Sequence, residues 1–150
     1  MNQTILLVED NHDDRALTLR ALRNILPLQV VVTAGDGAEA LDYLFGTGDY
    51  LGRNPAFIPK LVLLDLRLQK VNGLEVLKRI RCDARTRALP VIVFTSSHRE
   101  EDILDSYTSG ANSYIYKPVD YSQYCDNIKQ VVTYWLALCE LPAYTIRDAE

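Results

Sequence analysis

The architecture of this chain is set by the stretch Ile5-Leu6-Leu7-Val8-Glu9-Asp10. Four aliphatic residues in a row, bounded by polar ones, are typical of a strand that is buried on both faces of a parallel sheet. Because the run stops at Glu9 and Asp10, both acids are expected at the carboxyl end of this strand. Capping residues and regularly spaced leucines follow until Pro27, which predicts a helix over about residues 13–26.

The same alternation of apolar strands and amphipathic helices continues along the chain. We expect further strands at about residues 30–32, 61–64, 91–94 and 112–116. Further helices are expected at about residues 38–45, 73–83 and 103–110, and a last helix carries an apolar stripe from Ile128 to Leu138. Residues 46–59 contain three glycines and two prolines, and are predicted to form a long loop without a regular element.

Strands that alternate with helices predict right-handed βαβ units. We therefore expect an α/β fold with a doubly wound, five-stranded parallel sheet and helices on both faces. Ligands of such sheets bind beyond the carboxyl ends of the strands. The 150 residues contain no internal repeat and no linker, so a single domain is expected over residues 1–150.

The composition excludes several classes of protein. Apolar residues make up 48% of the chain and charged residues 24%, which is ordinary for a globular domain and not for a disordered one. No apolar run approaches the roughly 20 residues that span a bilayer. Residues 1–4 have no basic residue ahead of the first apolar run and no A-x-A cleavage site, so no signal peptide is expected. A cytoplasmic protein without membrane contact is expected. Three cysteines without a C-x-x-C pair indicate neither disulfides nor a zinc site.

The formal net charge of −4 argues against nucleic acid as the main partner. A local exception is a basic cluster, which consists of Lys78, Arg79, Arg81, Arg85 and Arg87. It could dock an anionic partner. It also lies at the end of a predicted helix, where the helix dipole favours cations, and we expect mainly structural, solvated side chains there.

Complementary polar groups follow four of the five predicted strands. They are Glu9 and Asp10, Asp65, Thr95 and Ser96, and Lys117. Three carboxylates at one edge repel one another unless a cation lies between them, and oxygen ligands favour Mg²⁺ or Mn²⁺ over zinc or copper. Such a metal site suits a phosphoryl group, with Lys117 and Thr95 contacting its other oxygens, and a carboxylate can itself be the nucleophile.

These residues resemble the receiver domains of two-component response regulators. The motifs are Ile5-Leu6-Leu7-Val8-Glu9-Asp10-Asn11, Leu63-Leu64-Asp65-Leu66-Arg67-Leu68 followed by Asn72-Gly73, Phe94-Thr95-Ser96, and Tyr114-Ile115-Tyr116-Lys117-Pro118. The resemblance implies a flavodoxin-like sheet with strand order 2-1-3-4-5. It covers about residues 4–138, which leaves about residues 139–150 as a C-terminal extension.

The resemblance also implies a role for each residue of the site. Asp65 would accept a phosphoryl group from a sensor histidine kinase, and Lys117 and Thr95 would bind its oxygens. The expected ligands of Mg²⁺ are Asp10, Asp65 and the backbone carbonyl of Arg67, with Glu9 acting through water. Tyr114 would swing inward as Thr95 moves, which changes the face formed by the fourth helix, fifth strand and fifth helix. The protein would assist its own phosphorylation and dephosphorylation without being an enzyme in the usual sense.

Two features resemble a narrower group, the stand-alone response regulators of cyanobacterial phytochromes. They are the long loop at residues 46–59 and the extended last helix that reaches Trp135-Leu136. A phytochrome would then be the kinase partner. Three positions depart from the family pattern: Arg67, Gln69 and Val119. Neither Arg67 nor Gln69 removes the expected chemistry, since Arg67 contributes only its carbonyl to the metal.

Other interpretations of the motifs are weaker. A haloacid-dehalogenase-like phosphatase needs a second acid two residues after its nucleophile, where this chain has Arg67. A receiver fold that binds partners without phosphorylation stays open as the main alternative. Gly46-Thr47-Gly48 lacks the spacing of a nucleotide-binding loop. His12 and His98 lack a paired nucleophile and are expected at the surface.

The last helix is the candidate interface. No segment of helix-turn-helix size follows residue 138, so we expect output through a protein partner and no DNA binding in cis. The apolar residues of the last helix exceed what one core-facing stripe requires, and they are Tyr134, Trp135, Leu136, Leu138 and Leu141. A homodimer through this region is predicted, and the alternative is that the tail folds back over its own core.

Overall fold

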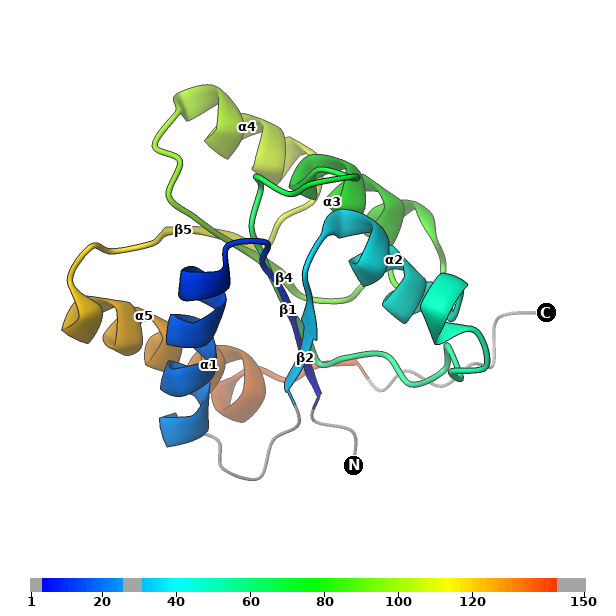
Figure 1. Cartoon of the computed structure of the whole chain (residues 1–150), viewed down its shortest axis with the longest axis horizontal. Coiled ribbons are helices and arrows are strands. Elements are labelled where there is room, and N and C mark those ends of the chain that lie inside the picture. Colours follow the sequence, from blue (N-terminus) through cyan, green and yellow to red (C-terminus); the bar gives the residue numbers. More distant parts are fainter. Residues whose placement is uncertain (1–3, 26–30, 143–150) are drawn as a thin grey trace.

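The protein folds around a five-stranded parallel sheet with the strand order β2-β1-β3-β4-β5 (Figure 1). The structure is a computed structural model that describes residues 4–25 and 31–142. Its strands are β1 (Ile5–Val8), β2 (Val31–Ala34), β3 (Leu61–Leu64), β4 (Val91–Thr95) and β5 (Ser113–Tyr116). The predicted fold class and strand order are confirmed. β2 extends to Ala34, beyond the predicted range, and Val30 lies outside the described residues.

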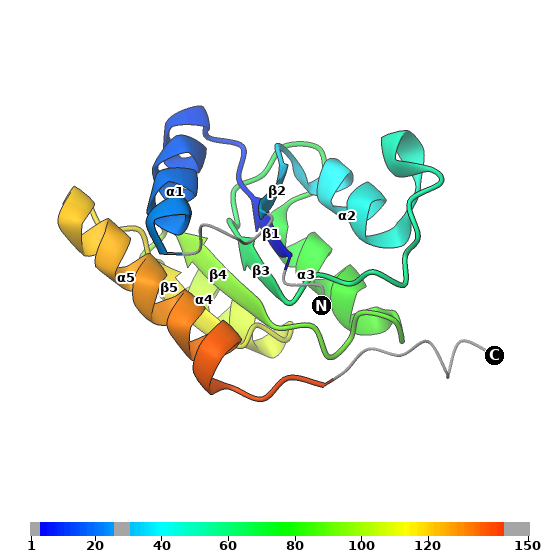
Figure 2. The same cartoon turned by 90° about the horizontal axis from the view of Figure 1, so that it is seen from below.

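Helices cover both faces of this sheet (Figure 2). They are α1 (His12–Ile25), α2 (Gly37–Phe45), α3 (Gly73–Cys82), α4 (Glu100–Thr108) and α5 (Tyr121–Thr133). One core lies between the sheet and α1 and α5, and the other lies between the sheet and α2 and α3. Position 26, the predicted end of the first helix, is outside the described residues.

Each central strand supplies both cores because its side chains alternate between the two faces. In β1, Ile5 and Leu7 belong to the core under α1 and α5, whereas Leu6 and Val8 belong to the core under α2 and α3. All four are buried. Burial of each such side chain contributes about 1.5–3 kcal/mol relative to exposure, so the sheet is the rigid part of the molecule.

Four helices begin with an acid or amide cap near the carboxyl ends of the strands, and the cap of α1 is Asn11. The side chains of Asp36, Asn72 and Asp120 accept hydrogen bonds from the backbone N–H groups three residues later, at 2.8, 3.0 and 2.8 Å. Each cap satisfies a backbone donor that the helix itself leaves unpaired. The caps therefore fix where the loops after β2, β3 and β5 turn into helices.

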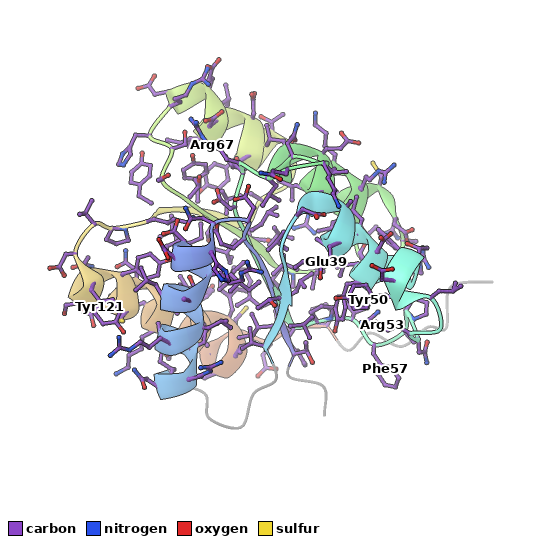
Figure 3. The ribbon with its side chains drawn as sticks, in the orientation of Figure 1. Glu39, Tyr50, Arg53, Phe57, Arg67 and Tyr121 are labelled. Atoms are coloured by element: carbon purple, nitrogen blue, oxygen red, sulfur yellow. The ribbon has the colours of Figure 1, made fainter. Side chains whose placement is uncertain are left out.

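The loop at residues 46–59 is more ordered than predicted. It contains a short 3₁₀ turn, Gly48–Tyr50, where the sequence was expected to form no regular element. The Tyr50 hydroxyl donates a hydrogen bond to Glu39 Oε1 at 3.1 Å, and the Arg53 guanidinium lies 3.9 Å from the centre of the Tyr43 ring. Figure 3 shows Glu39, Tyr50 and Arg53 on α2 and the loop that follows it. Contacts to α2 thus order this loop, although its glycines and prolines disfavour long helices and strands.

The basic cluster is divided between structural roles. Arg81 donates hydrogen bonds to the carbonyls of Gly110 and Leu89 and to the side chain of Asn112, at 2.9, 2.7 and 2.9 Å. Arg85 pairs with Asp83 at 2.8 Å. Arg81 therefore links the end of α3 to the start of β5, and the cluster is not a uniform patch of free cations.

The chain continues from α5 into a π-helical turn, Tyr134–Leu138. Trp135 and Leu136 are half-buried and pack against the core under α5, whereas Tyr134 and Leu138 are exposed. Part of the predicted interface therefore folds back onto its own domain. Of the predicted extension, residues 143–150 lie outside the described part. Within residues 4–25 and 31–142, no helix is both long and apolar enough to cross a membrane.

Gly37 provides a test of how closely the loops are packed. A Cβ atom at this position would lie 1.7 Å from the carbonyl oxygen of Val71, so Gly37→Ala should lower the free energy of unfolding by about 1–3 kcal/mol. Gly35→Ala is the matched control, because its Cβ would lie 3.4 Å from the mobile end of Arg15. Urea denaturation measures both changes. Equal stability of the two variants would contradict this packing.

Candidate functional site

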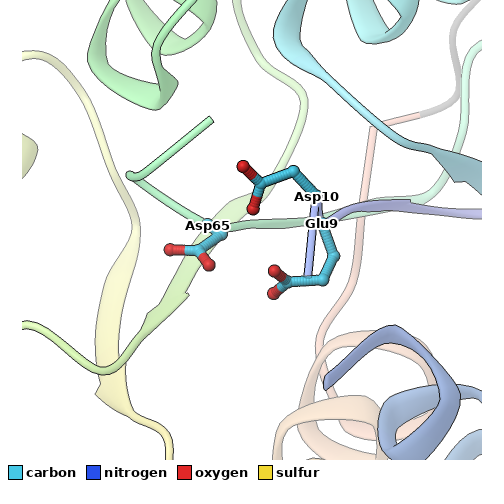
Figure 4. Close-up of side chains that lie close together, drawn as sticks. All are labelled: Glu9, Asp10 and Asp65. Carbon is cyan, nitrogen blue, oxygen red and sulfur yellow. The ribbon is translucent and has the colours of Figure 1, made fainter. Parts of the chain in front are cut away.

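The site lies at the carboxyl edge of the sheet, where three acids converge (Figure 4). Glu9 and Asp10 follow β1, and Asp65 follows β3. One carboxylate oxygen from each of the three lies within 4.8 Å of the others. Glu9 and Asp65 are buried and Asp10 is half-buried. β1 and β3 are direct neighbours in the sheet, which is why residues so distant in sequence meet.

Lys117 supplies the positive charge of this site. Its ammonium group lies 2.5 Å from Glu9 Oε2, 2.8 Å from Asp65 Oδ2 and 2.9 Å from Asp14 Oδ2. Only 5% of its side chain is exposed. The backbone N–H of Lys117 donates to the carbonyl of Thr95 at 2.8 Å, which fixes the start of the side chain at the end of β4. Three hydrogen bonds use all three donors of the ammonium group.

Asp14 is a site residue that the sequence analysis missed. It was considered only as part of the helix cap at the start of α1. Its backbone N–H donates to the Asn11 side chain at 2.9 Å, so the first turn of α1 is held against the site. The partner of Asp14 in the site is Lys117, which lies 103 residues away in the sequence, so no local spacing pointed to this role.

The charges of the site do not balance. Four carboxylates, from Glu9, Asp10, Asp14 and Asp65, face one ammonium group, which leaves a formal charge of 1 − 4 = −3 when all are ionised. A cluster of this charge and of oxygen donors fits a hard divalent cation such as Mg²⁺ or Mn²⁺. Asp10, whose carboxylate is half-exposed, would be its most accessible ligand.

The imbalance changes the acidity of two groups. Burial, followed by repulsion from Asp65, raises the pKa of Glu9 to about 7, although Lys117 acts in the opposite direction. For Lys117, burial lowers the pKa, but attraction to Asp65 and hydrogen bonds to three carboxylates outweigh it, so the pKa is raised above its usual value. Lys117 therefore stays charged at neutral pH, and Glu9 is the group that titrates there.

Backbone geometry holds the Asp65 carboxylate in place. Oδ1 accepts a hydrogen bond from the backbone N–H of Arg67 at 3.3 Å, and Oδ2 contacts Lys117. The Asp65 backbone N–H donates to the Val8 carbonyl at 3.1 Å. Gly73 lets the loop close tightly, because a Cβ atom there would lie 2.3 Å from the Asp65 carbonyl oxygen. Asp65 is thus a buried, oriented carboxylate at the end of β3.

The predicted switch residues lie on the neighbouring strands. Thr95 ends β4 and is fully buried, and its hydroxyl accepts from the Ser97 N–H at 3.4 Å. The Tyr114 hydroxyl donates to the Ser97 carbonyl at 3.0 Å, and burial raises the pKa of this phenol. Ser96 is exposed. Thr95 and Tyr114 are therefore joined through Ser97 in the loop after β4.

The remaining candidates lie outside the acidic cluster. His12 is exposed at the start of α1, and His98 is stacked on Tyr116 with ring centres 3.8 Å apart. The predicted surface placement of both histidines is confirmed. Gly46 ends α2, at the opposite end of that helix from the site, which agrees with the rejection of a nucleotide-binding loop.

Comparison with protein families gives one match. A family model described as the response regulator receiver domain matches residues 5–129. Among curated proteins, Response regulator Rcp1 of Synechocystis sp. is 33% identical over 141 residues, which cover 94% of this chain and 94% of Rcp1. Probable methanogenesis regulatory protein FilR2 of Methanothrix harundinacea is 39% identical over 132 residues, or 88% of this chain and 83% of that protein.

Solved structures agree with these relatives. The phosphorylated cyanobacterial phytochrome response regulator RcpA is 39% identical and superimposes with a TM-score of 0.88, covering 95% of this chain and all of RcpA. The Mn²⁺-bound form of Rcp1 is 33% identical, with a TM-score of 0.85 over 94% of this chain and 99% of Rcp1. A homologue that binds a divalent metal thus has the fold that carries the acidic cluster here.

The raised pKa of Glu9 predicts how stability depends on pH. Between about 4.5 and about 7 the folded protein keeps the Glu9 proton and the unfolded chain loses it, so each rise in pH favours unfolding. In EDTA, wild type should lose roughly 1 to 3 kcal/mol relative to Glu9→Gln over this interval. Urea denaturation at a series of pH values measures the loss.

Glu75→Gln, which changes an exposed acid of α3, is the control and should follow the wild-type curve. Parallel curves for wild type and Glu9→Gln would show that Glu9 titrates with an ordinary pKa.

Proposed function

Because this chain belongs to the response regulator receiver-domain family, we propose that it accepts a phosphoryl group on Asp65 from a sensor histidine kinase. The observation that carries the proposal is the arrangement of a buried, oriented Asp65 carboxylate beside a three-acid cluster and Lys117. In the reaction an Asp65 oxygen attacks phosphorus, the bond from phosphorus to the donor nitrogen breaks, and an acyl phosphate forms.

Mg²⁺ is the proposed metal, and Mn²⁺ is an alternative. Asp10, Asp65 and the backbone carbonyl of Arg67 would hold it, with Glu9 contributing through water. The metal neutralises charge on the phosphoryl oxygens when it is bound. Lys117 would contact another of these oxygens, and the Thr95 hydroxyl a further one. Support comes from the acidic cluster and from the Mn²⁺-bound homologue.

The proposed output is a change in the surface formed by α4, β5 and α5. Thr95 would move toward the phosphoryl group, and Tyr114 would turn inward into the space that Thr95 leaves. Their shared contact with Ser97 supports a coupled movement. Exposed apolar side chains on this surface suit a protein partner, and they include Leu104, Tyr107, Tyr116 and Val119.

The proposed kinase is a phytochrome. RcpA, which is described as a phytochrome response regulator, is similar to this chain over nearly its whole length, and so is Rcp1. The proposed protein is cytoplasmic and consists of one receiver domain. It would signal through protein partners and not by binding DNA itself. The net charge of −4 supports the last point. The alternative is a receiver fold that binds its partners without being phosphorylated.

Intact mass spectrometry tests the phosphorylation. Incubation with acetyl phosphate and Mg²⁺ should add one phosphoryl group to wild type and none to Asp65→Asn, and EDTA should prevent the addition. Asp49→Asn, which changes an exposed acid outside the site, should be labelled like wild type. A folded wild-type protein that binds no Mg²⁺ and takes no phosphoryl group would favour the phosphorylation-independent alternative.

We also propose that the protein is a homodimer through its C-terminal helical region. Tyr134 and Leu138 support this, because 49% and 73% of these apolar side chains are exposed on one short turn. Trp135 and Leu136 contribute less, since they pack against their own core. The proposed contact is therefore smaller than the sequence indicated.

Leu138→Lys should halve the mass found by sedimentation if this contact holds the dimer. An exposed position tolerates the substitution, so folding should be retained. Leu51→Lys changes an equally exposed leucine in the loop at residues 46–59 and should leave the mass unchanged. Identical masses for wild type and Leu138→Lys would overturn the proposed dimer contact.

A further inference from the structure

A cavity of about 240 Å³ borders the proposed phosphoacceptor. It is lined by Leu66, Arg67, Asn72, Leu74, Arg99 and Asp102. Leu66 and Arg67 directly follow Asp65, and Arg99 precedes the first turn of α4, so the cavity lies between the loops that follow β3 and β4. Figure 3 shows Arg67 at this end of the molecule, near α3 and α4. The lining of the cavity thus begins with the residue that follows Asp65 in the chain.

The cavity has more positive than negative groups. Arg67 is exposed, and its side chain makes no ion pair within the described residues. Arg99 pairs with Glu101, but 60% and 62% of these side chains are exposed, so the pair is weak and exchangeable. The Asp102 carboxylate accepts a hydrogen bond from the Ser97 hydroxyl at 2.6 Å and keeps its negative charge. The lining of the cavity therefore contains two guanidinium groups and one carboxylate.

The positive charge of Arg67 contrasts with the negative charge of the neighbouring site. The neighbouring site carries a formal charge of −3 when ionised, which repels any anionic group on an approaching donor. Arg67 is the nearest cation along the chain to Asp65, and its side chain makes no hydrogen bond to residues 4–25 or 31–142. A guanidinium group matches a carboxylate through two parallel hydrogen bonds. The cavity is thus suited to a carboxylate that arrives together with the phosphoryl group.

We propose that Arg67, assisted by Arg99, binds an acidic side chain that the phosphoryl donor carries next to its phosphorylated histidine. Arg67 is then a specificity-determining residue that selects donor proteins with an acid at this position. The inference rests on the proposed function, because it concerns the donor for Asp65. Opposite charges across such a contact fix the orientation of a partner and suppress partners of the wrong charge.

Two matched peptides test the proposal. Both are acetylated and amidated and contain phosphohistidine, flanked by Glu on both sides in one and by Gln on both sides in the other. With Mg²⁺, wild type should be phosphorylated about two- to fivefold faster by the Glu peptide, as a partly exposed ion pair allows. Intact mass spectrometry gives both rates, and the measured quantity is their ratio within each variant. The ratio should fall toward one at high salt.

Substitutions assign the preference to the cavity. Arg67→Ala should bring the ratio to about one, and Arg99→Ala should reduce it. Arg67→Lys keeps the charge but loses the two parallel hydrogen bonds, so it should keep only part of the preference. Arg79→Ala, on the exposed side of α3, is the matched control and should keep the wild-type ratio. Circular dichroism checks that each variant is folded. A wild-type ratio of one, or a ratio that Arg67→Ala leaves unchanged, would overturn the proposal.

Acetyl phosphate separates this outcome from failure of the proposed function. A wild-type protein that acetyl phosphate labels on Asp65, but that shows no preference between the peptides, keeps its function as a phosphoacceptor and loses only the donor selectivity. A wild-type protein that no donor labels overturns both.

Discussion

The ammonium group of Lys117 holds three carboxylates from three different parts of the chain together. Burial of the Glu9 carboxylate, followed by repulsion from Asp65, raises its pKa to about 7, because the single buried cation Lys117 offsets these effects only in part. The rest of the site follows from this constraint. Four acids around one cation leave an excess of negative charge, which the proposed divalent metal would reduce before the proposed phosphoryl group binds.

Strand order makes this arrangement possible. β1 lies between β2 and β3, so the acids after β1 and the acid after β3 project from adjacent strands. β4 and β5 continue the sheet on the same side, and they bring Thr95 and Lys117 to the same edge. Four connections of 10 or more residues deliver these groups, and the apolar strands hold them in register. The chemistry is carried by loops, and its precision comes from the buried sheet.

The surroundings of Asp65 fit the proposed phosphoacceptor better than a phosphatase. Two residues after Asp65, where a haloacid-dehalogenase-like phosphatase needs an acid, Arg67 extends into a cavity beside the loop after β4. Its backbone N–H orients the Asp65 carboxylate, and its side chain is left for another role. The match of residues 5–129 to the receiver family agrees with this reading of the site. The position of the Asp65 carboxylate thus supports the proposed role as a phosphoacceptor.

Local patterns in the chain were enough to predict the sheet and most of the site. Apolar runs end at Glu9, Asp65, Thr95 and Lys117. These residues can be predicted to lie close together, because the carboxyl ends of parallel strands meet at one edge of the sheet. Local patterns did not predict contacts between distant segments. These are the pairing of Asp14 with Lys117, the hydrogen bonds of Arg81 near the start of β5, and the packing of Trp135 against its own core. The same holds for the pKa of Glu9. Each depends on burial and on neighbours more than 20 residues away, which exist only once the chain has folded.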